Sequence, residues 1–361
     1  MSLGRQKSEA ERPASESGPY KTIASGTAKP KNEEQNANLK IGHYTGPYED
    51  WSGYRTVNAP ATIPARAAPK DPDHWQPLVY VDSTGGLMTQ RFAAAQWCFV
   101  TPFALKSGEE LRGILGKGPA KYGSAEYEEQ ARELIDISAG LTDRQKAISE
   151  YWADGPGTEQ PPGHWLRLAE FVSARDHQSL DNDVKMYFAL SNAMLDAGIA
   201  AWDAKRTFDS VRPVTAISFL YRGKKIRAWG GPGKGTGEMD GSQWLPYQPG
   251  TFPTPAFPDF VSGHSTYSAA AARILELWTG SEQFGASATI AKGSSKIEPG
   301  ITPREEIELR WGTFGEAANE AGMSRRYGGI HFERADLMGR KLGRATAEKA
   351  WLRAQRYFDG H

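Results

Sequence analysis

Three short clusters of basic, hydroxyl and imidazole side chains follow one another along the chain. They are Lys205 with Arg212, then Ser262-Gly263-His264, and finally Arg325 with His331. Cationic and hydrogen-bond-donating groups of these kinds bind tetrahedral oxyanions, and an imidazole can also act as a nucleophile, a proton carrier or a metal ligand. Each cluster alone has an ordinary structural explanation, but the three together predict one oxyanion pocket.

Lys205 and Arg212 are seven positions apart, or about two helical turns. Pro213 disfavours helical geometry at the residue before it. Lys205 is therefore expected in the last turns of a helix and Arg212 at its exit, where the helix dipole favours cations. A solvated helix end is the simpler explanation of this pair when it is taken alone.

The tripeptide Ser262-Gly263-His264 precedes an alanine-rich segment, residues 265–279, that is expected to be helical. A serine hydroxyl and the backbone N–H of a glycine at a helix start can both approach an anion closely. His264 is then placed to hydrogen-bond an oxygen of that anion and to transfer protons near neutral pH. The alternative is an ordinary cap by Ser262 or Ser265, followed by a histidine that is satisfied within the fold.

Arg325 and His331 flank the turn Arg326-Tyr327-Gly328-Gly329-Ile330, whose two glycines let a guanidinium and an imidazole approach one pocket. An imidazole in that place is either a nucleophile toward phosphorus or a ligand to a metal centre. A surface arginine pair followed by a histidine at a helix start explains the segment equally well when it is taken alone.

The elements that must position these clusters are amphipathic helices. Apolar residues recur at spacings of three and four in residues 126–138, 141–152, 164–176, 182–208, 265–278, 303–322 and 332–358. Thr142 is expected to begin one helix, and Asp181 or Asn182 to cap the long helix that ends near Thr207. The sequence therefore predicts an all-α catalytic unit, a helical bundle, over residues 123–361.

Two segments precede this bundle. Residues 1–40 are rich in Lys, Glu, Ser, Pro and Asn and nearly lack large aliphatic side chains, so they are expected to form a disordered polar arm. Residues 41–122 are aromatic and interrupted by Pro and Gly, and they are expected to be an irregular segment that packs on the bundle, with one short strand at Val79-Tyr80-Val81. Within the bundle, residues 222–257 are expected to form a loop.

Composition limits the available functions. Lys plus Arg and Asp plus Glu both number 43 in 361 residues, so the net charge of zero argues against binding to nucleic acid or to an anionic membrane. Cys98 is the only cysteine, which rules out an internal disulfide and makes a cysteine-based metal site implausible. The remaining histidines show no metal-ligand spacing and are expected to be structural or surface residues: His43, His74, His164, His177 and His361. Without an apolar leader or a run of about 18 apolar residues, a cytoplasmic location is the default expectation, with export left open.

With this order of motifs, the chain resembles the superfamily that joins type 2 phosphatidic acid phosphatases, bacterial class A acid phosphatases and vanadium-dependent haloperoxidases. The resemblance covers roughly residues 124–345. It implies that His331 binds vanadium axially and that His264 hydrogen-bonds the apical oxygen of vanadate. The implied contacts to the equatorial oxygens come from Lys205, Arg212, Ser262, Gly263 and Arg325. In a phosphatase, His331 would instead be the nucleophile and His264 the leaving-group acid.

Further residues resemble the haloperoxidase branch in particular. The segment RRYGGIHFERAD, residues 325–336, is similar to the haloperoxidase pattern, and Asp336 lies one place later than the phosphatase pattern expects. Trp202 and Phe257 match halide-pocket positions of chloroperoxidase-type members, and Asp154 in YWADGPG resembles the acid that pairs with a pocket arginine. Family members usually open with a helical region, whereas a polar arm precedes the matching stretch here.

The resemblance therefore implies a vanadate-dependent haloperoxidase that oxidises halide with hydrogen peroxide to hypohalous acid, which a small organic acceptor then consumes. Lys205, His264 and Asp154 would be its catalytic side chains, with Lys205 polarising the peroxide. Because vanadate imitates the geometry of phosphoryl transfer, phosphate can occupy the same site, and a soluble acid phosphatase is the alternative. A third hypothesis is an oxyanion-binding protein without turnover. No membrane or nucleic-acid partner is expected, and assembly into a homo-oligomer is left open.

Overall fold

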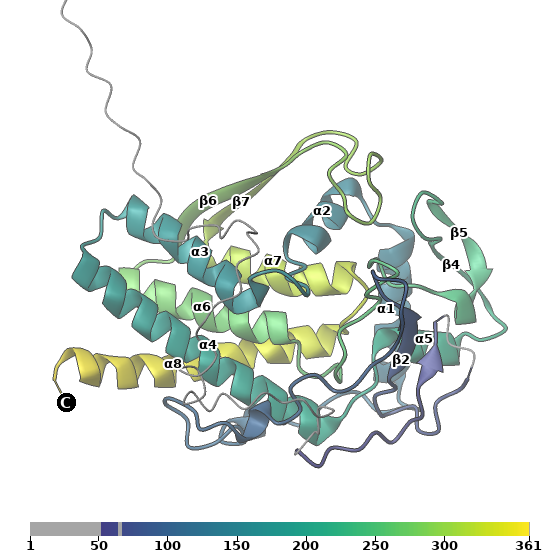
Figure 1. The fold of residues 1–361 in the computed structure, drawn as a ribbon, viewed down its shortest axis with the longest axis horizontal. Coiled ribbons are helices and arrows are strands. Elements are labelled where there is room, and N and C mark those ends of the chain that lie inside the picture. Colours follow the sequence, from purple (N-terminus) through teal and green to yellow (C-terminus); the bar gives the residue numbers. More distant parts are fainter. Residues whose placement is uncertain (1–51, 64–66, 361) are drawn as a thin grey trace, which may run out of the picture. The chain divides into compact units, whose positions relative to one another are not determined.

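Helices dominate the part of the chain that the computed structural model describes, residues 52–63 and 67–360 (Figure 1). The polar arm predicted at residues 1–40 lies outside the described residues. The helices are α1 Ala125–Ala139, α2 Asp143–Tyr151, α3 Gln160–Arg175, α4 Leu180–Phe208, α5 Pro213–Leu220, α6 Gly263–Thr279, α7 Phe314–Tyr327 and α8 Glu333–Phe358. Short 3₁₀ turns lie at Trp97–Phe99, Arg112–Leu115 and Gly241–Gln243.

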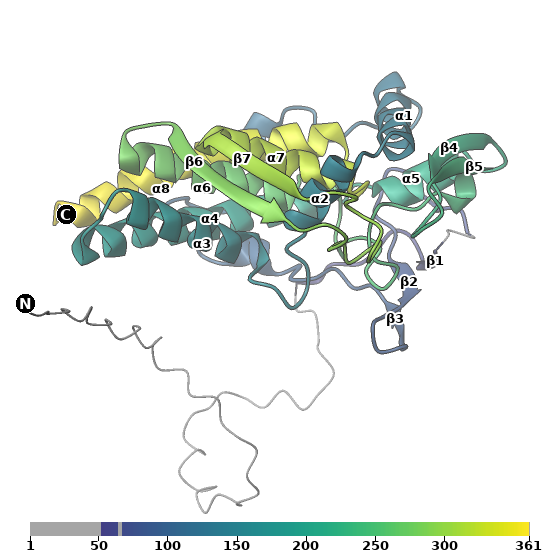
Figure 2. The same ribbon diagram turned by 90° about the horizontal axis from the view of Figure 1, so that it is seen from above.

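Helix α6 lies at the centre of a bundle formed with α4, α7 and α8. It packs against each of the three, and α4 also packs against α8, as Figures 1 and 2 show. Small residues allow these helices to approach closely: residues 269–272 of α6 are buried alanines, and a Cβ atom on Gly343 of α8 would lie 2.2 Å from the carbonyl oxygen of Thr266. The predicted all-α helical bundle is therefore confirmed. The close approach of α8 to α6 depends on Gly343, which has no side chain to separate them.

Local capping explains where two of these helices begin. Thr142 caps α2, as predicted, and exchanges hydrogen bonds with Gln145 in a capping box. Helix α4 is capped by Ser179, whose hydroxyl accepts the backbone N–H of Asn182, and not by Asp181 or Asn182 as the sequence suggested. Its acidic residues lie instead in the first turn, where the positive end of the helix dipole stabilises them.

Arg212 begins a new helix and does not end the preceding one. Helix α4 stops at Phe208, and Asp209 follows it in the left-handed conformation with φ 43°. Pro213 is the first residue of α5, a position that requires no backbone N–H, and Arg212 caps it in an extended conformation. The predicted non-helical backbone of Arg212 before Pro213 is therefore correct. The prediction that Arg212 lies at the end of the preceding helix is wrong, because it caps the next one.

The strands form small sheets at the edges of the bundle. β1 (Ala61–Thr62) pairs in parallel with β2 (Leu78–Val81), and the antiparallel pairs are β2 with β3 (Leu87–Thr89), β4 (Lys225–Trp229) with β5 (Thr236–Asp240), and β6 (Gln283–Ile290) with β7 (Ile307–Thr313). The predicted strand at residues 79–81 is part of β2. The β4–β5 hairpin lies within the segment expected to be a loop. Ile226 and Ala228, on either side of the exposed Arg227, bury one face of β4.

Residues 303–322 do not form the single helix that the sequence predicted. Residues 307–313 are strand β7, and α7 begins at Phe314 behind a capping box formed by Thr313 and Glu316. Leu309 and Trp311 are buried while the residues between and beside them are exposed, so the apolar period in this stretch is two and not 3.6. The pairing partner β6 lies more than 15 residues earlier, which is why the local pattern was misread.

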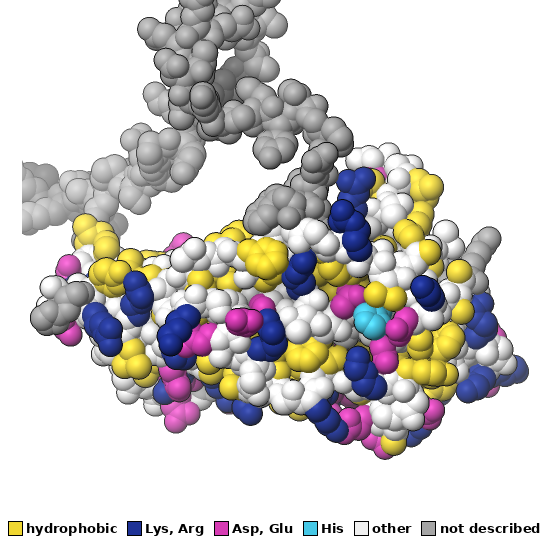
Figure 3. Space-filling view, turned by 90° about the horizontal axis from the view of Figure 1, so that it is seen from below, with side chains coloured by type: hydrophobic (Ala, Val, Ile, Leu, Met, Phe, Trp, Pro, Cys, Tyr) yellow, Lys and Arg dark blue, Asp and Glu magenta, His cyan; other side chains and the backbone are white. Residues whose placement is uncertain are grey.

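The described surface carries no single dominant charge on the face seen in Figure 3, where basic, acidic and apolar side chains are intermixed. This distribution agrees with the net charge of zero. Among the described residues, no helix is long and apolar enough to cross a membrane.

Candidate functional site

The three predicted clusters meet at one end of the bundle. Lys205 lies in the last turn of α4, Arg212 caps α5, Ser262-Gly263-His264 starts α6, Arg325 lies in the last turn of α7, and His331 lies just before α8. The side chains are deeply buried: Lys205, Arg212, Ser262, Arg325 and His331 are each at most 1 % exposed. Five separate helix ends therefore assemble one buried polar cluster.

Lys205 is held by carbonyl groups of the loop that precedes α6. Its Nζ donates to the carbonyl oxygens of Pro258 at 2.8 Å and Asp259 at 3.1 Å, and it lies 4.6 Å from the ring centroid of Phe257. Burial, followed by the neighbouring charge of Arg212, lowers the pKa of Lys205 well below its ordinary value. A nearby anion would relieve that penalty by compensating the ammonium charge.

Arg212 links Lys205 to His331. Its Nε donates to the carbonyl oxygen of Phe257, and its Nη1 donates to that of Ile330, both at 2.7 Å. The same Nη1 lies 3.2 Å from Nε2 of His331, while Nη2 has no hydrogen-bond partner. Burial lowers the pKa of Arg212 to about 10. The N–H groups of Arg212 Nη2 are therefore free to donate to a bound anion.

The ring of His331 is oriented by a carboxylate that the sequence reasoning did not identify. Asp259 Oδ1 lies 2.8 Å from His331 Nδ1, and both residues are buried. Because the arginine can only donate, Nε2 of His331 is the acceptor in its contact with Arg212, and the ring proton is on Nδ1 facing Asp259. Burial first, then Arg212 and Lys205, lower the pKa of His331, which favours the neutral ring with a lone pair on Nε2.

Asp259 is itself strongly affected by its surroundings. Burial raises its pKa to about 7, against the opposing effect of Arg212 and Lys205. The only signal for this residue in the sequence is a carboxylate inside the apolar run Phe257-Pro258-Asp259-Phe260, which has no obvious use on a surface.

The resemblance implies that His331 binds vanadium. On that expectation, replacing Asp259 with alanine should weaken vanadate binding by about 10–100-fold, the usual cost of removing the hydrogen-bond partner of a metal-bound histidine. Asp259→Asn keeps an acceptor oxygen facing His331 and should retain most of the affinity. Calorimetric titration of vanadate into both variants checks this expectation. Equal losses in the two variants would show that the charge of Asp259, and not its hydrogen bond, matters.

Ser262 is a helix cap as well as a member of the cluster. Its hydroxyl oxygen accepts the backbone N–H of Ser265 at 3.3 Å and lies 2.8 Å from the Ser265 hydroxyl. Gly263 is the first residue of α6, and a Cβ atom there would lie 3.6 Å from the Trp202 ring. The ordinary structural explanation is therefore correct for Ser262, and it leaves the start of α6 facing the cluster.

His264 and Arg325 form the other side of the cluster together with Asp154. His264 Nε2 lies 3.7 Å from Asp154 Oδ2 and has no hydrogen-bond partner. Arg325 donates to the carbonyl oxygens of Ser149 at 2.8 Å and Ala153 at 3.3 Å. Burial, then the charge of Arg325, lowers the pKa of His264 well below its ordinary value, and burial lowers that of Arg325 to about 10.

Trp202 and Phe257 lie beside the cations. Their ring centroids are 5.2 Å apart, and Arg212 lies 4.9 Å from the Phe257 ring, on which Lys205 also packs. The indole N–H of Trp202 donates to the carbonyl oxygen of Ala93 in the N-terminal segment. These two rings form an apolar surface beside Lys205 and Arg212.

The buried charges of the cluster fit an oxyanion. Three cations, Lys205, Arg212 and Arg325, are buried with two carboxylates, Asp154 and Asp259. Unpaired buried charge is costly, so an anion among these cations stabilises the cluster. Three side-chain atoms of the described cluster have no hydrogen-bond partner. Arg212 Nη2 and His264 Nε2 are groups that an oxyanion can satisfy, whereas Asp154 Oδ2 is an acceptor. Among the described residues, no group of three or more His, Cys, Asp or Glu side chains is arranged to hold a metal cation.

Comparisons with known proteins identify the same architecture. Residues 185–360 match the model of the VCPO second helical-bundle domain. The fold is similar to that of a bacterial vanadium-dependent chloroperoxidase in its holo form (TM-score 0.74, 26 % identity, covering 86 % of this chain and 66 % of that one) and in its apo form (TM-score 0.75, 26 % identity, 86 % and 67 %). It is also similar to the first bacterial vanadium-dependent iodoperoxidase of known structure (TM-score 0.58, 25 % identity, 80 % and 62 %).

The chain thus spans about two thirds of the length of the chloroperoxidase chains that it matches. No curated protein sequence matches it significantly.

Proposed function

We propose that this chain, which belongs to the vanadium-dependent haloperoxidase family, oxidises halide ions with hydrogen peroxide to hypohalous acid at a vanadate ion held in the buried cluster. The observation that carries the proposal is the surplus of buried cations around Nε2 of His331, whose lone pair is directed away from Asp259. A cationic cradle suits an oxyanion, and a neutral imidazole nitrogen suits a bond to its central atom.

Each residue of the cluster would have its own role at a bound vanadate. His331 would hold the vanadium through Nε2, and its oxygens would be held by Lys205, Arg212, Ser262, Gly263 and Arg325. When bound, vanadate supplies a Lewis-acid centre that keeps its oxidation state while peroxide oxidises the halide. Lys205 and Arg212 present fixed positive charge where negative charge develops on oxygen, and preorganised charges in a buried site are especially effective.

His264 would hold and release the proton at Nε2, the atom that lacks a partner within the protein. The reaction H₂O₂ + X⁻ + H⁺ → HOX + H₂O consumes one proton for each halide, so a group that can deliver one is required. Asp154, 3.7 Å away, would stabilise the protonated ring. A small organic acceptor then takes up the halogen from hypohalous acid.

The decisive experiment incubates the vanadate-free protein with vanadate and assays peroxide-dependent halogenation and phosphate-ester hydrolysis separately. Halogenation that depends on added vanadate supports the proposal. Hydrolysis that vanadate inhibits would instead identify an acid phosphatase that uses His331 as phosphoryl acceptor. Vanadate binding without either activity would identify an oxyanion-binding protein.

Phe257→His is expected to change the ratio of chloride to bromide turnover several-fold while vanadate still binds. The phenyl ring contacts both Lys205 and Arg212, and each such cation–π contact is worth about 0.5–2 kcal/mol. A histidine replaces this apolar surface with hydrogen-bonding groups beside Lys205 and Arg212, whereas the backbone carbonyl that accepts from Arg212 remains. Phe257→Tyr, which keeps the aromatic face, is the matched control. Identical halide ratios in wild type and Phe257→His would remove this ring from the halide pocket.

A further inference from the structure

His164 on α3 contacts the acid–base side of the site, although the sequence predicted only a structural or surface role for it. Its Nδ1 lies 3.0 Å from Asp154 Oδ1. Its ring stacks on Trp152 with centroids 4.7 Å apart and meets the edge of Tyr151 at 5.0 Å. The side chain is 11 % exposed, so this orientation is determined by packing on α2 and by the carboxylate.

Asp154 is shared between two histidines. Oδ1 accepts a hydrogen bond from His164 Nδ1, because an ionised carboxylate can only accept, while Oδ2 lies 3.7 Å from His264 Nε2. Oδ2 itself has no hydrogen-bond partner. The backbone of Asp154 is left-handed with φ 42°, a conformation that aspartate adopts more readily than most residues other than glycine.

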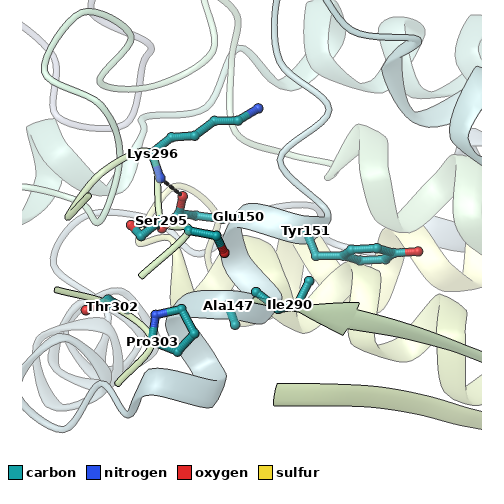
Figure 4. A pocket seen from close by; sticks show the side chains of 9 residues that line it. Ala147, Glu150, Tyr151, Ile290, Ser295, Lys296, Thr302 and Pro303 are labelled. Carbon is teal, nitrogen blue, oxygen red and sulfur yellow. Dashed lines mark hydrogen bonds between the residues drawn. The ribbon is translucent and has the colours of Figure 1, made fainter. Parts of the chain in front are cut away.

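A cavity of about 430 Å³ next to Asp154 is large enough for its carboxylate to adopt a second orientation. Asp154 and His164 both line it, and its other charged or titratable lining side chains are Glu150, Tyr151, Glu159, Arg167, Glu170 and Lys296. Figure 4 shows the adjoining smaller pocket of about 150 Å³, whose lining shares Glu150, Tyr151 and Lys296. Arg167 on the cavity side is already paired with Glu159 at 3.2 Å, so Lys296 is the lining cation placed to attract a carboxylate that lost its present partner.

We propose that His164 is a positioning residue for the acid–base pair: its hydrogen bond to Oδ1 of Asp154 keeps Oδ2 directed at His264 and keeps the carboxylate out of the outer cavity. The inference rests on the proposed function, in which His264 delivers the proton that each turnover consumes. Burial and the charge of Arg325 lower the pKa of His264, whereas the backbone groups of Ala153 and Trp152 raise it. A carboxylate held 3.7 Å from its Nε2 also favours the protonated ring. His164 contacts the acid–base pair through Asp154, and a positive charge on its own ring would lower the pKa of His264 directly.

Three variants of His164 distinguish the effect of its hydrogen bond to Asp154 from the effect of its ring stacked on Trp152. His164→Asn keeps an N–H near the place of Nδ1 and lacks the stacked ring. His164→Phe keeps a ring on Trp152 and lacks the donor. His164→Leu lacks both. With the vanadate-loaded protein, we expect His164→Asn to retain most of the halogenation rate and the other two to lose about tenfold, the effect of one charge-assisted hydrogen bond. Vanadate affinity should stay within about threefold of wild type in all three, since each leaves the cradle intact.

A second readout does not need turnover. The pKa of the His264 ring is measured by NMR on histidine-labelled protein saturated with inorganic phosphate. All three variants remove the direct effect of the His164 charge on His264, so they are compared with one another. We expect the His264 pKa to be about one unit lower in His164→Phe and His164→Leu than in His164→Asn. This measurement remains meaningful if the wild-type protein does not halogenate, so a failure of the proposed function and a failure of this inference are distinguishable.

Two results would overturn the inference. Retained activity and an unchanged His264 pKa in His164→Phe, with losses in His164→Asn, would show that only the packing of the ring matters. Equal loss of turnover in His164→Asn and His164→Phe, with the His264 pKa unchanged in both, would show that His164 transfers protons itself and does not position Asp154.

Discussion

Replacing His331 with alanine is expected to weaken vanadate binding by more than about a hundredfold. Loss of only the hydrogen-bond partner of a metal-bound histidine typically costs about 10–100-fold, and this variant removes the bond itself. The buried ring, oriented by Asp259 through Nδ1, is the one imidazole in the described cluster whose Nε2 faces Arg212 and lies between the cations. Without it, only hydrogen bonds and charge remain to hold an anion that water solvates well.

Phosphate provides the matched control for this variant. In the ground state it accepts the same hydrogen bonds from Lys205, Arg212 and Arg325 but forms no bond from its central atom to the imidazole. Phosphate affinity should therefore fall much less than vanadate affinity in His331→Ala. Calorimetric titration of both anions into wild type and variant gives the comparison. If the two anions weakened equally, the cavity would have collapsed or His331 would not be a vanadium ligand.

His264→Ala is expected to lower turnover by about 10²–10⁴-fold, the contribution typical of a positioned general acid or base. Vanadate affinity should fall far less. The variant removes one hydrogen bond to the anion, worth about 1.5–3 kcal/mol or one to two powers of ten in affinity, and keeps the three buried cations. Steady-state halogenation and vanadate titration on the same preparation separate the two effects.

The two histidine variants also test each other. His264→Gln restores hydrogen-bonding capacity without a titratable ring, so it should recover affinity and not turnover. Should His264→Ala abolish vanadate binding while His331→Ala leaves it intact, the two histidines would have to exchange roles. That outcome would place the metal-binding nitrogen beside Asp154 instead of Asp259.

Much of the helical framework follows from local pattern alone. The capping box at Thr142, the extended backbone of Arg212 before Pro213 and the helical periods of the long segments depend on side chains within a few positions of each other. Steric and hydrogen-bonding rules for helices also act over only a few positions of the chain. The strand β7 was not predicted because its backbone hydrogen bonds are made with β6, a distant segment.

The sequence by itself indicated most of the side chains of the buried polar cluster, because their types and order along the chain predict one anion pocket with two imidazoles. It did not indicate Asp259. Only the tertiary structure decided how the two imidazoles are oriented. Asp259 is 72 positions from His331, and Asp154 is shared by His164 and His264 from two different helices. Hydrogen bonds to a buried ring are made by whichever groups the packing of distant helices brings within about 3 Å, and no local spacing encodes that choice.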